Sequence, residues 1–321
     1  MKKARHVVLL PVLAFAALGI VWGSNYIYMK LASELITPMQ IVFFRVLFGF
    51  LPVLLYALVK GEVRLNHFRH AHHFVVMALL AAIIQYYGFA KGTSFLHSGV
   101  AGAVTGAIPL FSFILAVLFI PEEKASPLKV LGVVLGLGGV LAIAGPSGEQ
   151  LADSNMVGVA YMMMGSLGLG SSFIYARKYI VPLQLPGAAL TTYQLGIGLL
   201  ILALITDYSG ISGIWTDLHA SLGLIIGLGL LGTGFAFIIY YYIVKELGAV
   251  TASSATYLPP VVALLIGAVV VGEPIGMVEY LATSMILAGV VLLRTKASKQ
   301  DLQRMAFDEN STGQSRIKYS R

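Results

Sequence analysis

The chain of 321 residues contains no cysteine, and only 11% of its residues are charged. The absence of cysteine excludes disulfides, thiolate metal ligands and a thiol nucleophile. The scarcity of charge excludes an ordinary soluble domain, in which about 25% of residues are charged. Hydrophobic residues make up 58% of the chain, and the mean hydropathy is +0.87. This composition predicts an all-α integral membrane protein.

Carboxylates are also missing from the middle of the apolar stretches. The aspartates lie in polar connections or in the C-terminal tail, and the glutamates lie near the ends of apolar stretches. Buried Asp and Glu residues are the usual proton relays and ion ligands of transporters. The sequence therefore favours facilitated export or exchange, with proton coupling left open only through a group at a helix end.

Ten apolar runs are long enough to cross a bilayer, because about 20 helical residues span a hydrocarbon core of about 30 Å. The first run resembles a signal peptide in its basic start, but it continues past Trp22 and is longer than a usual signal core. We predict ten transmembrane helices at approximately Val7–Met29, Met39–Val59, Phe74–Lys91, Val100–Ile120, Lys129–Gly145, Met156–Tyr175, Ala188–Ile205, Ser221–Val244, Thr251–Val271 and Ile275–Leu293.

The lysines and arginines predict the orientation of these helices. If the N-terminus is cytoplasmic, most of the 21 Lys and Arg residues fall at cytoplasmic helix ends, with Lys30, Arg45 and Lys91 as exceptions. We therefore expect both termini in the cytoplasm. The net charge of +7 then reflects this bias and the attraction of the tail to anionic lipid, and it requires no nucleic-acid partner.

The two halves of the chain repeat one another. A shift of about 150 residues places Pro109 on Pro259 and Glu123 on Glu273, and a slightly smaller shift aligns "GSNYIYMK" with "GSSFIYAR". Five helices per repeat is an odd number, so the halves have opposite orientations in the membrane. The expected units are residues 1–146 and 156–293, followed by a polar, disordered cytoplasmic tail at 294–321.

Inverted repeats predict a central cavity and alternating access, because each half can open the cavity to the opposite side. Pro109, Pro259 and Pro260 lie inside the predicted helices, where proline removes a backbone hydrogen bond. We interpret them as hinges, with simple packing kinks as the alternative.

Arg45 is the main candidate for substrate binding. A central arginine costs about 2.5–3.5 kcal/mol on insertion scales, so it should face protein, water or an anion. Its planar fork suits a carboxylate, phosphate or sulfonate, although it could instead extend toward the interface or pair with Glu34. The residues that we expect at cavity depth are Trp22, Ser24, Asn25, Arg45, Gln85, Tyr86, Lys91, Ser171, Ser172, Tyr175, Tyr193, Gln194 and Tyr257.

Two motifs raise other functions. "GISG" at 210–213 superficially matches a serine nucleophile motif, and "NHFRHAHHF" at 66–74 could hold a metal. The first lies in a predicted outer loop, and the second is typical of a solvated basic loop. We therefore expect no enzyme activity, no cofactor and no metal site.

Several stretches together resemble the drug/metabolite transporter superfamily, in its branch with paired EamA domains. They are "WGSNYIYMK", "TPMQIVFFR", "IPLFSFILAVLFIPEE" and "GVVLGLGGVLA", and in the second half "VKELGAVTASSATYLPPVVALLIGAVVVGEPI" and "MILAGVVLL". The resemblance implies ten helices in two inverted repeats and export of small metabolites or amino acids across a bacterial inner membrane. Lys91 departs from the pattern, because related transporters mostly carry an apolar residue there; it would tune specificity toward anions or simply end a helix.

The sequence thus predicts an exporter of amino acids or related carboxylate compounds. An exporter of nucleobases or drug-like metabolites, and a channel-like or lipid-handling protein, are the alternatives. Its partners are then a small-molecule substrate and membrane lipids, and the protein is a monomer or a homodimer.

Overall fold

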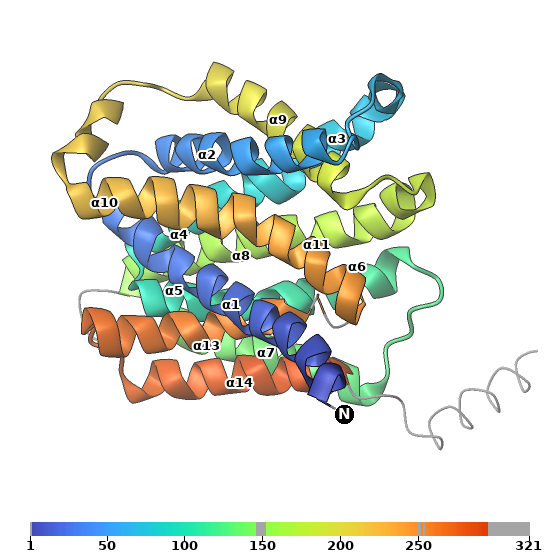
Figure 1. Ribbon diagram of the computed structural model, residues 1–321. Helices are drawn as coiled ribbons and strands as arrows, with labels where there is room; N and C mark the ends of the chain where they lie inside the picture. Colours follow the sequence, from blue (N-terminus) through green and yellow to red (C-terminus); the bar gives the residue numbers. More distant parts are fainter. Residues whose placement is uncertain (1, 146–151, 249–251, 253, 295–321) are drawn as a thin grey trace, which may run out of the picture.

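The structure is a computed structural model that describes residues 2–145, 152–248, 252 and 254–294. Every regular element among these residues is helical (Figure 1). Nine of the described helical stretches are long and apolar enough to cross a membrane, and Met277–Leu293 is a shorter apolar helix. The ten predicted helices are therefore confirmed as apolar helical segments. Most of the tail predicted to be disordered, 295–321, lies outside the described residues.

The ten segments are numbered here in chain order. Segments one to five are α1 (Lys2–Ser33), α2 (Pro38–Val59), η1 (Leu65–His70) with α3 (Ala71–Ala78), η2 (Leu79–Ile84) and α4 (Gln85–Phe95), α5 (Ser98–Val104) with η3 (Thr105–Ala107) and α6 (Ile108–Phe119), and α7 (Pro127–Ala144). Segments six to ten are α8 (Ala152–Tyr175) with η4 (Ala176–Ile180) and η5 (Val181–Leu183), α9 (Gly187–Ile205), α10 (Leu218–Leu222) with η7 (Gly223–Phe235) and α11 (Ala236–Leu247), η8 (Ser254–Tyr257) with α13 (Leu258–Leu265) and η9 (Ile266–Val271), and α14 (Met277–Arg294). A short 3-10 element, η6 (Ile211–Thr216), precedes α10.

The beginning of α2 shows how the local sequence sets a helix end. Thr37 accepts a hydrogen bond from the backbone N–H of Gln40, and the Gln40 side chain accepts one from the backbone N–H of Thr37. This capping box satisfies two N–H groups that would otherwise lack partners, and Pro38 supplies a preset first turn. The Gln40 amide also donates to the carbonyl oxygens of Asp207 and Ser209, at 2.7 and 2.9 Å. One residue therefore begins α2 and ties it to the connection after α9.

The fourth and ninth segments are interrupted at equivalent places. In each, a 3-10 turn leads into an α-helix that has a proline in its first turn, namely Pro109 in α6 and Pro259 in α13. Pro260 follows and is buried. Proline is tolerated at this position because its missing N–H would have no helical acceptor there. The breaks exist as the sequence predicts, and the hinge role remains a prediction.

Helix contacts follow the repeat. Exchanging the halves turns the contact of α1 with α13 into that of α8 with α6, and the contact of α1 with η7 into that of α8 with α4. The pairs α7 with α14, α5 with α13, and α2 with α9 each map onto themselves. Figure 1 shows α7, α13 and α14 on one side of the bundle and α2, α3 and α9 on the other. The packing therefore has an approximate twofold relation between the halves.

Glycine allows α7 and α14 to pack backbone against backbone. A Cβ atom at Gly132 would lie 2.6 Å from the carbonyl oxygen of Gly289, and one at Gly289 would overlap the Gly132 carbonyl. Lipid provides no hydrophobic drive for helix association, so such close approach supplies van der Waals contact instead. The two helices therefore pack with their backbones in direct contact.

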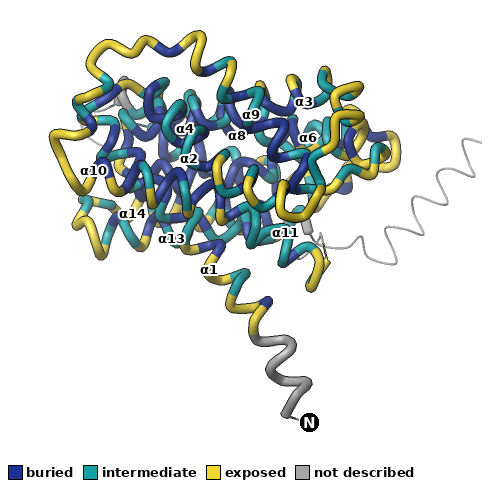
Figure 2. The backbone as a smooth tube through the Cα atoms, turned by 45° about the horizontal axis from the view of Figure 1, so that its top comes forward, coloured by how far each residue is buried: buried dark blue, intermediate teal, exposed yellow. Residues whose placement is uncertain are grey.

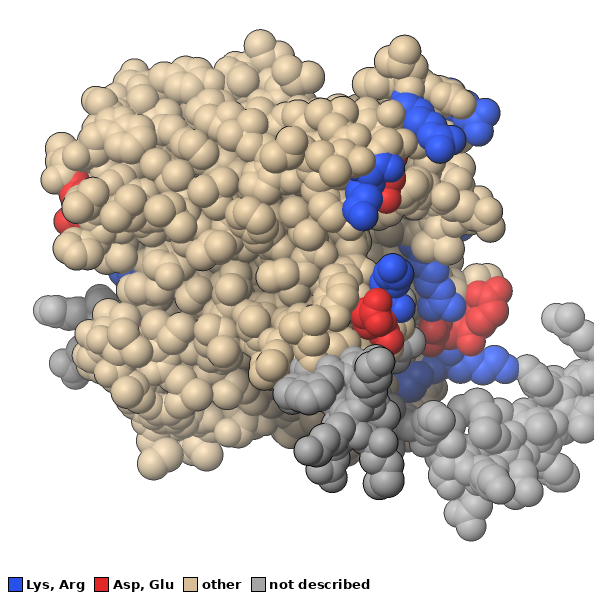
Figure 3. All heavy atoms as spheres, in the orientation of Figure 1, with Lys and Arg blue, Asp and Glu red and all other residues tan. Residues whose placement is uncertain are grey.

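The charged side chains gather at one end of the bundle, leaving a broad uncharged belt between the two ends (Figure 3). In the backbone view, buried segments lie inside the bundle, and the connections at its ends are exposed (Figure 2). The end with Arg64, Lys129, Arg177 and Lys245 is called the basic end below, and the other the opposite end. An apolar belt between two polar ends is the arrangement required of a bilayer-spanning bundle.

Candidate functional site: a central cavity

A cavity of about 300 Å³ lies between the two halves. Eight of the ten segments contribute to its lining, and α7 and α14 contribute nothing among the described residues. The lining residues are Trp22, Asn25, Tyr26, Arg45, Met77, Ala81, Gln85, Tyr86, Phe89, Thr105, Ile108, Leu169, Ser172, Phe173, Thr191, Gln194, Gly232, Phe237, Tyr240, Tyr241, Thr256 and Pro259.

The structure brings about half of the expected site residues together. Those in the lining are Trp22, Asn25, Arg45, Gln85, Tyr86, Ser172 and Gln194. Those placed outside the lining are Ser24, Lys91, Ser171, Tyr175, Tyr193 and Tyr257. Thr256 and Pro259 line the cavity on either side of Tyr257 in the chain.

Tyr193 instead binds the connection between α2 and η1, and Tyr175 binds α3 near the start of the third segment. The Tyr193 hydroxyl accepts from the backbone N–H of Arg64 and donates to the Arg64 carbonyl, at 2.9 and 3.0 Å. Its ring stacks on Phe74, with centroids 4.7 Å apart. The Tyr175 hydroxyl lies 2.7 Å from Nδ1 of His73. These tyrosines fix the basic end of α9 and α8 against the third segment.

Lys91 and Ser24 have local roles. The Lys91 ammonium lies 5.1 Å from the centroid of the Phe95 ring, one turn further along α4. The Ser24 hydroxyl donates to the carbonyl of Val21 in its own helix. Neither group faces the cavity, so neither is part of the candidate site.

Arg45 is buried, with 6% of its surface exposed, and its contacts are with neutral groups. Its Nε donates to the Thr233 hydroxyl at 3.0 Å, and its Nη1 lies 3.9 Å from the Met29 sulfur. The guanidinium carbon lies 3.8 Å from the centroid of the Tyr86 ring, a cation–π contact. No described Asp or Glu forms an ion pair with it, and Glu34, the partner considered from sequence, is not in contact. Among the residues that the structure describes, this buried charge therefore has no counterion.

Asn25 lies against the same part of η7. Asn25 is 4% exposed, and its Oδ1 atom packs against Gly232. A Cβ atom at position 232 would overlap this oxygen, so only glycine fits there. This oxygen is buried without a hydrogen-bond partner. An unpaired buried polar atom is costly, and such atoms concentrate at functional sites. Asn25 and Arg45 thus form a polar end of the cavity beside Gly232 and Thr233.

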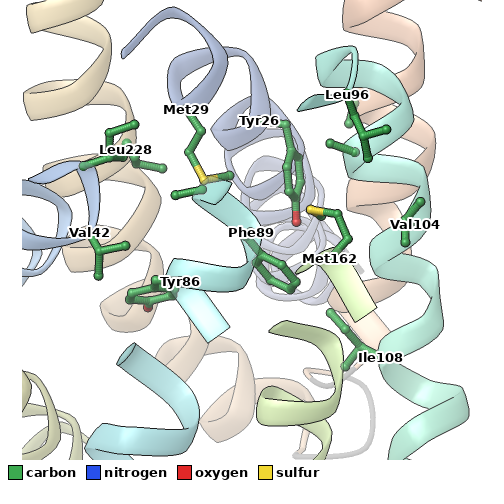
Figure 4. Packing of buried hydrophobic residues seen from close by; sticks show 14 of the residues in the cluster. Tyr26, Met29, Val42, Tyr86, Phe89, Leu96, Val104, Ile108, Met162 and Leu228 are labelled. Carbon is green, nitrogen blue, oxygen red and sulfur yellow. The ribbon is translucent and has the colours of Figure 1, made fainter. Parts of the chain in front are cut away.

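Aromatic rings make up much of the remaining wall. Tyr26 and Phe89 meet edge to face, with centroids 6.2 Å apart, and Figure 4 shows them side by side. The rings of Trp22 and Tyr240 lie 6.1 Å apart on the wall toward α11. Such a surface accepts a flat apolar group through burial and ring contacts.

A hydrogen bond between Thr191 and Tyr241 joins α9 to α11 beside the cavity. It uses one hydroxyl proton and one oxygen lone pair of the two groups. Part of the hydrogen-bonding capacity of this wall is therefore satisfied within the protein.

One lining residue that sequence reasoning missed is the repeat equivalent of a residue that it found. The alignment of "GSNYIYMK" with "GSSFIYAR" places Trp22, Asn25 and Tyr26 on Leu169, Ser172 and Phe173. All six line the cavity. The repeat would have identified Leu169 from Trp22, because a site on an approximate twofold axis is lined by equivalent positions of both halves. Tyr26 and Phe173 are equivalent to each other, so the repeat alone indicates neither.

The cavity extends from Arg45 toward the basic end. Arg45 is seven residues from the start of α2 at the opposite end, whereas Tyr241 is only four residues before Lys245 at the basic end. Met77 and Thr191 likewise lie within about two turns of the helix ends on the basic side. Arg45 and Asn25 therefore occupy the deep part of the cavity.

Glu273 ties the connection after η9 to the start of α5 at the opposite end. Its carboxylate accepts hydrogen bonds from the backbone N–H groups of Ser98 and Gly99 and from the Ser98 hydroxyl, at 2.7 to 2.9 Å. These bonds cap the first turn of α5, where free N–H groups favour an anion. Gly272, in a left-handed conformation with φ of 73°, makes the turn that presents Glu273.

Glu123, the repeat equivalent of Glu273, is held differently. It forms an ion pair of 2.9 Å with Arg177, and the two side chains are 31% and 52% exposed. Exposed ion pairs contribute about 0–1 kcal/mol, less than hydrogen bonds to a sheltered carboxylate. The two equivalent carboxylates are therefore held unequally.

The other sequence motifs lie away from the cavity. Ser212 of "GISG" is in η6, in the connection before α10. No group of three His, Asp or Glu residues within the described part of the chain is arranged to hold a metal, and this includes the histidines at 66–74.

Comparison with known proteins identifies the family. The sequence pattern of the EamA-like transporter family matches residues 9–145 and 156–295. The chain is 28% identical over 296 residues to the uncharacterized inner membrane transporter YedA of Escherichia coli K12, covering 89% of this chain and 91% of that protein. It is 22% identical over 280 residues to the uncharacterized transporter YoaV of Bacillus subtilis 168, covering 87% and 95%.

A solved crystal structure has the same fold. It superposes with a TM-score of 0.61 at 17% sequence identity, covering 88% of this chain and 96% of the other. These matches, and the apolar helices, make the protein a multi-pass inner membrane protein. The chain belongs to the EamA-like transporter family.

Proposed function

We propose that the protein exports small organic compounds that carry a carboxylate, amino acids or related metabolites, by alternating access. The observation that supports this most directly is Arg45, a buried arginine in the cavity with only neutral contacts. A guanidinium in such a site gains most from a carboxylate, because the two form paired charge-assisted hydrogen bonds.

The size and shape of the cavity support a small substrate. At about 300 Å³ it is at the lower end of the usual range for ligand pockets. A lipid would need more room and a lateral opening, and a channel would need a continuous path past the Glu273 contacts. The cavity favours a carrier over both of these alternatives.

The expected orientation in the membrane is consistent with export. The Lys and Arg residues at the basic end favour a cytoplasmic location for that end and for both termini. The cavity then faces the cytoplasm, from which an exporter takes its substrate.

The test is counterflow in proteoliposomes. Labelled amino acids, their amides and their decarboxylated analogues are compared in wild type, Arg45→Gln and the control Arg64→Gln, which makes the same substitution at an exposed position. We expect saturable exchange of carboxylate compounds in wild type and Arg64→Gln, and its loss in Arg45→Gln that remains folded by thermal unfolding.

The other outcomes have distinct meanings. Exchange of amides or amines as fast as carboxylates overturns the carboxylate assignment and favours the nucleobase or drug-like alternative. Conductance without saturation favours a channel. Unchanged exchange in Arg45→Gln removes Arg45 from substrate binding.

A further inference from the structure

The cavity has an unbalanced set of charges. Arg45 is the one ionic side chain among the described lining residues, and no Asp or Glu is among them. A bound carboxylate would neutralise the guanidinium. An amino acid would bring an ammonium group as well, which would be repelled by Arg45 and would find no carboxylate.

The neutral polar groups of the lining compensate an ammonium only weakly. The hydroxyl oxygens of Ser172, Thr191 and Tyr241 keep lone pairs that can accept a hydrogen bond, and the Asn25 oxygen is a further acceptor, but all of these groups are neutral. Neutral acceptors do not offset the repulsion between a desolvated ammonium and the guanidinium as a carboxylate would.

The walls favour a ring on the same substrate. Trp22, Tyr26, Phe89 and Tyr240 belong to the aromatic part of the lining, which extends from the depth of Asn25 toward the basic end. A compound whose carboxylate reaches Arg45 would therefore place the rest of its structure among aromatic rings. An aromatic group is stabilised there by apolar burial and by edge-to-face contacts.

We propose that the cavity selects aromatic monocarboxylates without an ammonium group over the zwitterionic amino acids of the same shape. This inference rests on the proposed export of carboxylate compounds and narrows it. The substrate class is an aryl-substituted carboxylic acid, recognised by Arg45 at its carboxylate and by the aromatic wall at its ring.

Three compounds of nearly equal size separate the possibilities, namely 3-phenylpropionate, L-phenylalanine and 2-phenylethylamine. Affinity is measured by ligand-induced shifts in thermal unfolding and by competition in counterflow. We expect 3-phenylpropionate to bind at least about tenfold more tightly than phenylalanine, because the guanidinium repels an ammonium that has no counterion in the cavity lining. Hexanoate, which has the charge without the ring, should bind more weakly than 3-phenylpropionate.

A second variant tests the charge argument directly. Gln194→Glu introduces a carboxylate at a buried lining position, and Gln184→Glu makes the same change at an exposed position outside the cavity. We expect Gln194→Glu to shift the ratio of affinities toward phenylalanine by about tenfold or more, and Gln184→Glu to leave it unchanged. A wild-type ratio in Gln194→Glu overturns the argument from charge.

The results also separate this inference from the proposed function. Phenylalanine that binds as well as 3-phenylpropionate or better overturns the selectivity while leaving carboxylate export intact. Preference for 2-phenylethylamine overturns both. If none of the three binds, while an aliphatic carboxylate does, the aromatic class is withdrawn and carboxylate export remains.

Discussion

Replacing Glu273 by glutamine should weaken the contact between the connection after η9 and the start of α5, and so favour a form that is open at the opposite end of the molecule. In the wild type, one carboxylate oxygen accepts from the N–H and hydroxyl of Ser98, and the other accepts from the N–H of Gly99. The glutamine amide keeps one oxygen and places an NH₂ group against a backbone N–H. One charge-assisted bond is lost and two donors face each other.

The magnitude follows from that lost bond. A hydrogen bond to a charged group contributes about 1.5–3 kcal/mol, so a change of about 2 kcal/mol is expected. This corresponds to about a 30-fold change in the ratio of open to closed forms. If the open form is about 1% of the wild type, it becomes roughly a quarter of the variant.

The assay uses the absence of native cysteine. Spin labels at His97→Cys and Met277→Cys, both exposed, report the distance between the connection before α5 and the start of α14. We expect Glu273→Gln to add a population at longer distances. The control is Glu279→Gln, the same change at a carboxylate that forms no hydrogen bond or ion pair with α5. Identical distance distributions in wild type and both variants would refute the reasoning.

Two further predictions concern stability. Gly289→Ala should lower the thermal midpoint in detergent, since its Cβ would overlap the Gly132 carbonyl and overpacking costs about 1–3 kcal/mol. Gly138→Ala, whose Cβ would meet its nearest neighbour at 3.5 Å, should have little effect; equal losses would contradict the packing argument. At the α9–α10 connection, the backbone N–H of Ser209 holds the pKa of Asp207 below its ordinary value of 3.8. The ionised carboxylate stabilises the connection above that value, and this contribution is lost as the pH falls through the lowered pKa. The difference in thermal midpoint between Asp207→Asn and wild type should therefore be smaller at about pH 3 than at about pH 6; a difference that grows in acid would be contrary to this account.

The sequence predicted the apolar segments because their length and composition depend on residues next to one another in the chain. It also predicted the breaks at Pro109 and Pro259, since proline acts locally. It predicts where a residue lies along its helix but not the direction in which its side chain faces. Tyr193 is predicted at cavity depth, yet its hydroxyl binds the backbone of Arg64 in the connection after α2.

Contacts between distant segments were beyond sequence reasoning. The pairing of Arg45 with Thr233 joins residues 188 apart and depends on how α2 packs on η7. The π-helical turns also make the facing of side chains hard to predict from sequence, because a wider turn rotates the residues that follow it around the helix axis. One such stretch, η2 at 79–84, immediately precedes Gln85 and Tyr86.

Under the proposed alternating access, the charge of Arg45 would make the empty carrier sensitive to voltage. With the basic end in the cytoplasm, a cavity open to that end holds the guanidinium near the cytoplasmic potential, and the alternative state would hold it near the external one. A charge that experiences the full potential gains about 2.3 kcal/mol per 100 mV, so a membrane that is negative inside favours the empty, cytoplasm-facing state. A bound monoanion cancels the charge and removes this bias. The electric field would then reset the unloaded protein and leave the loaded one free to turn outward.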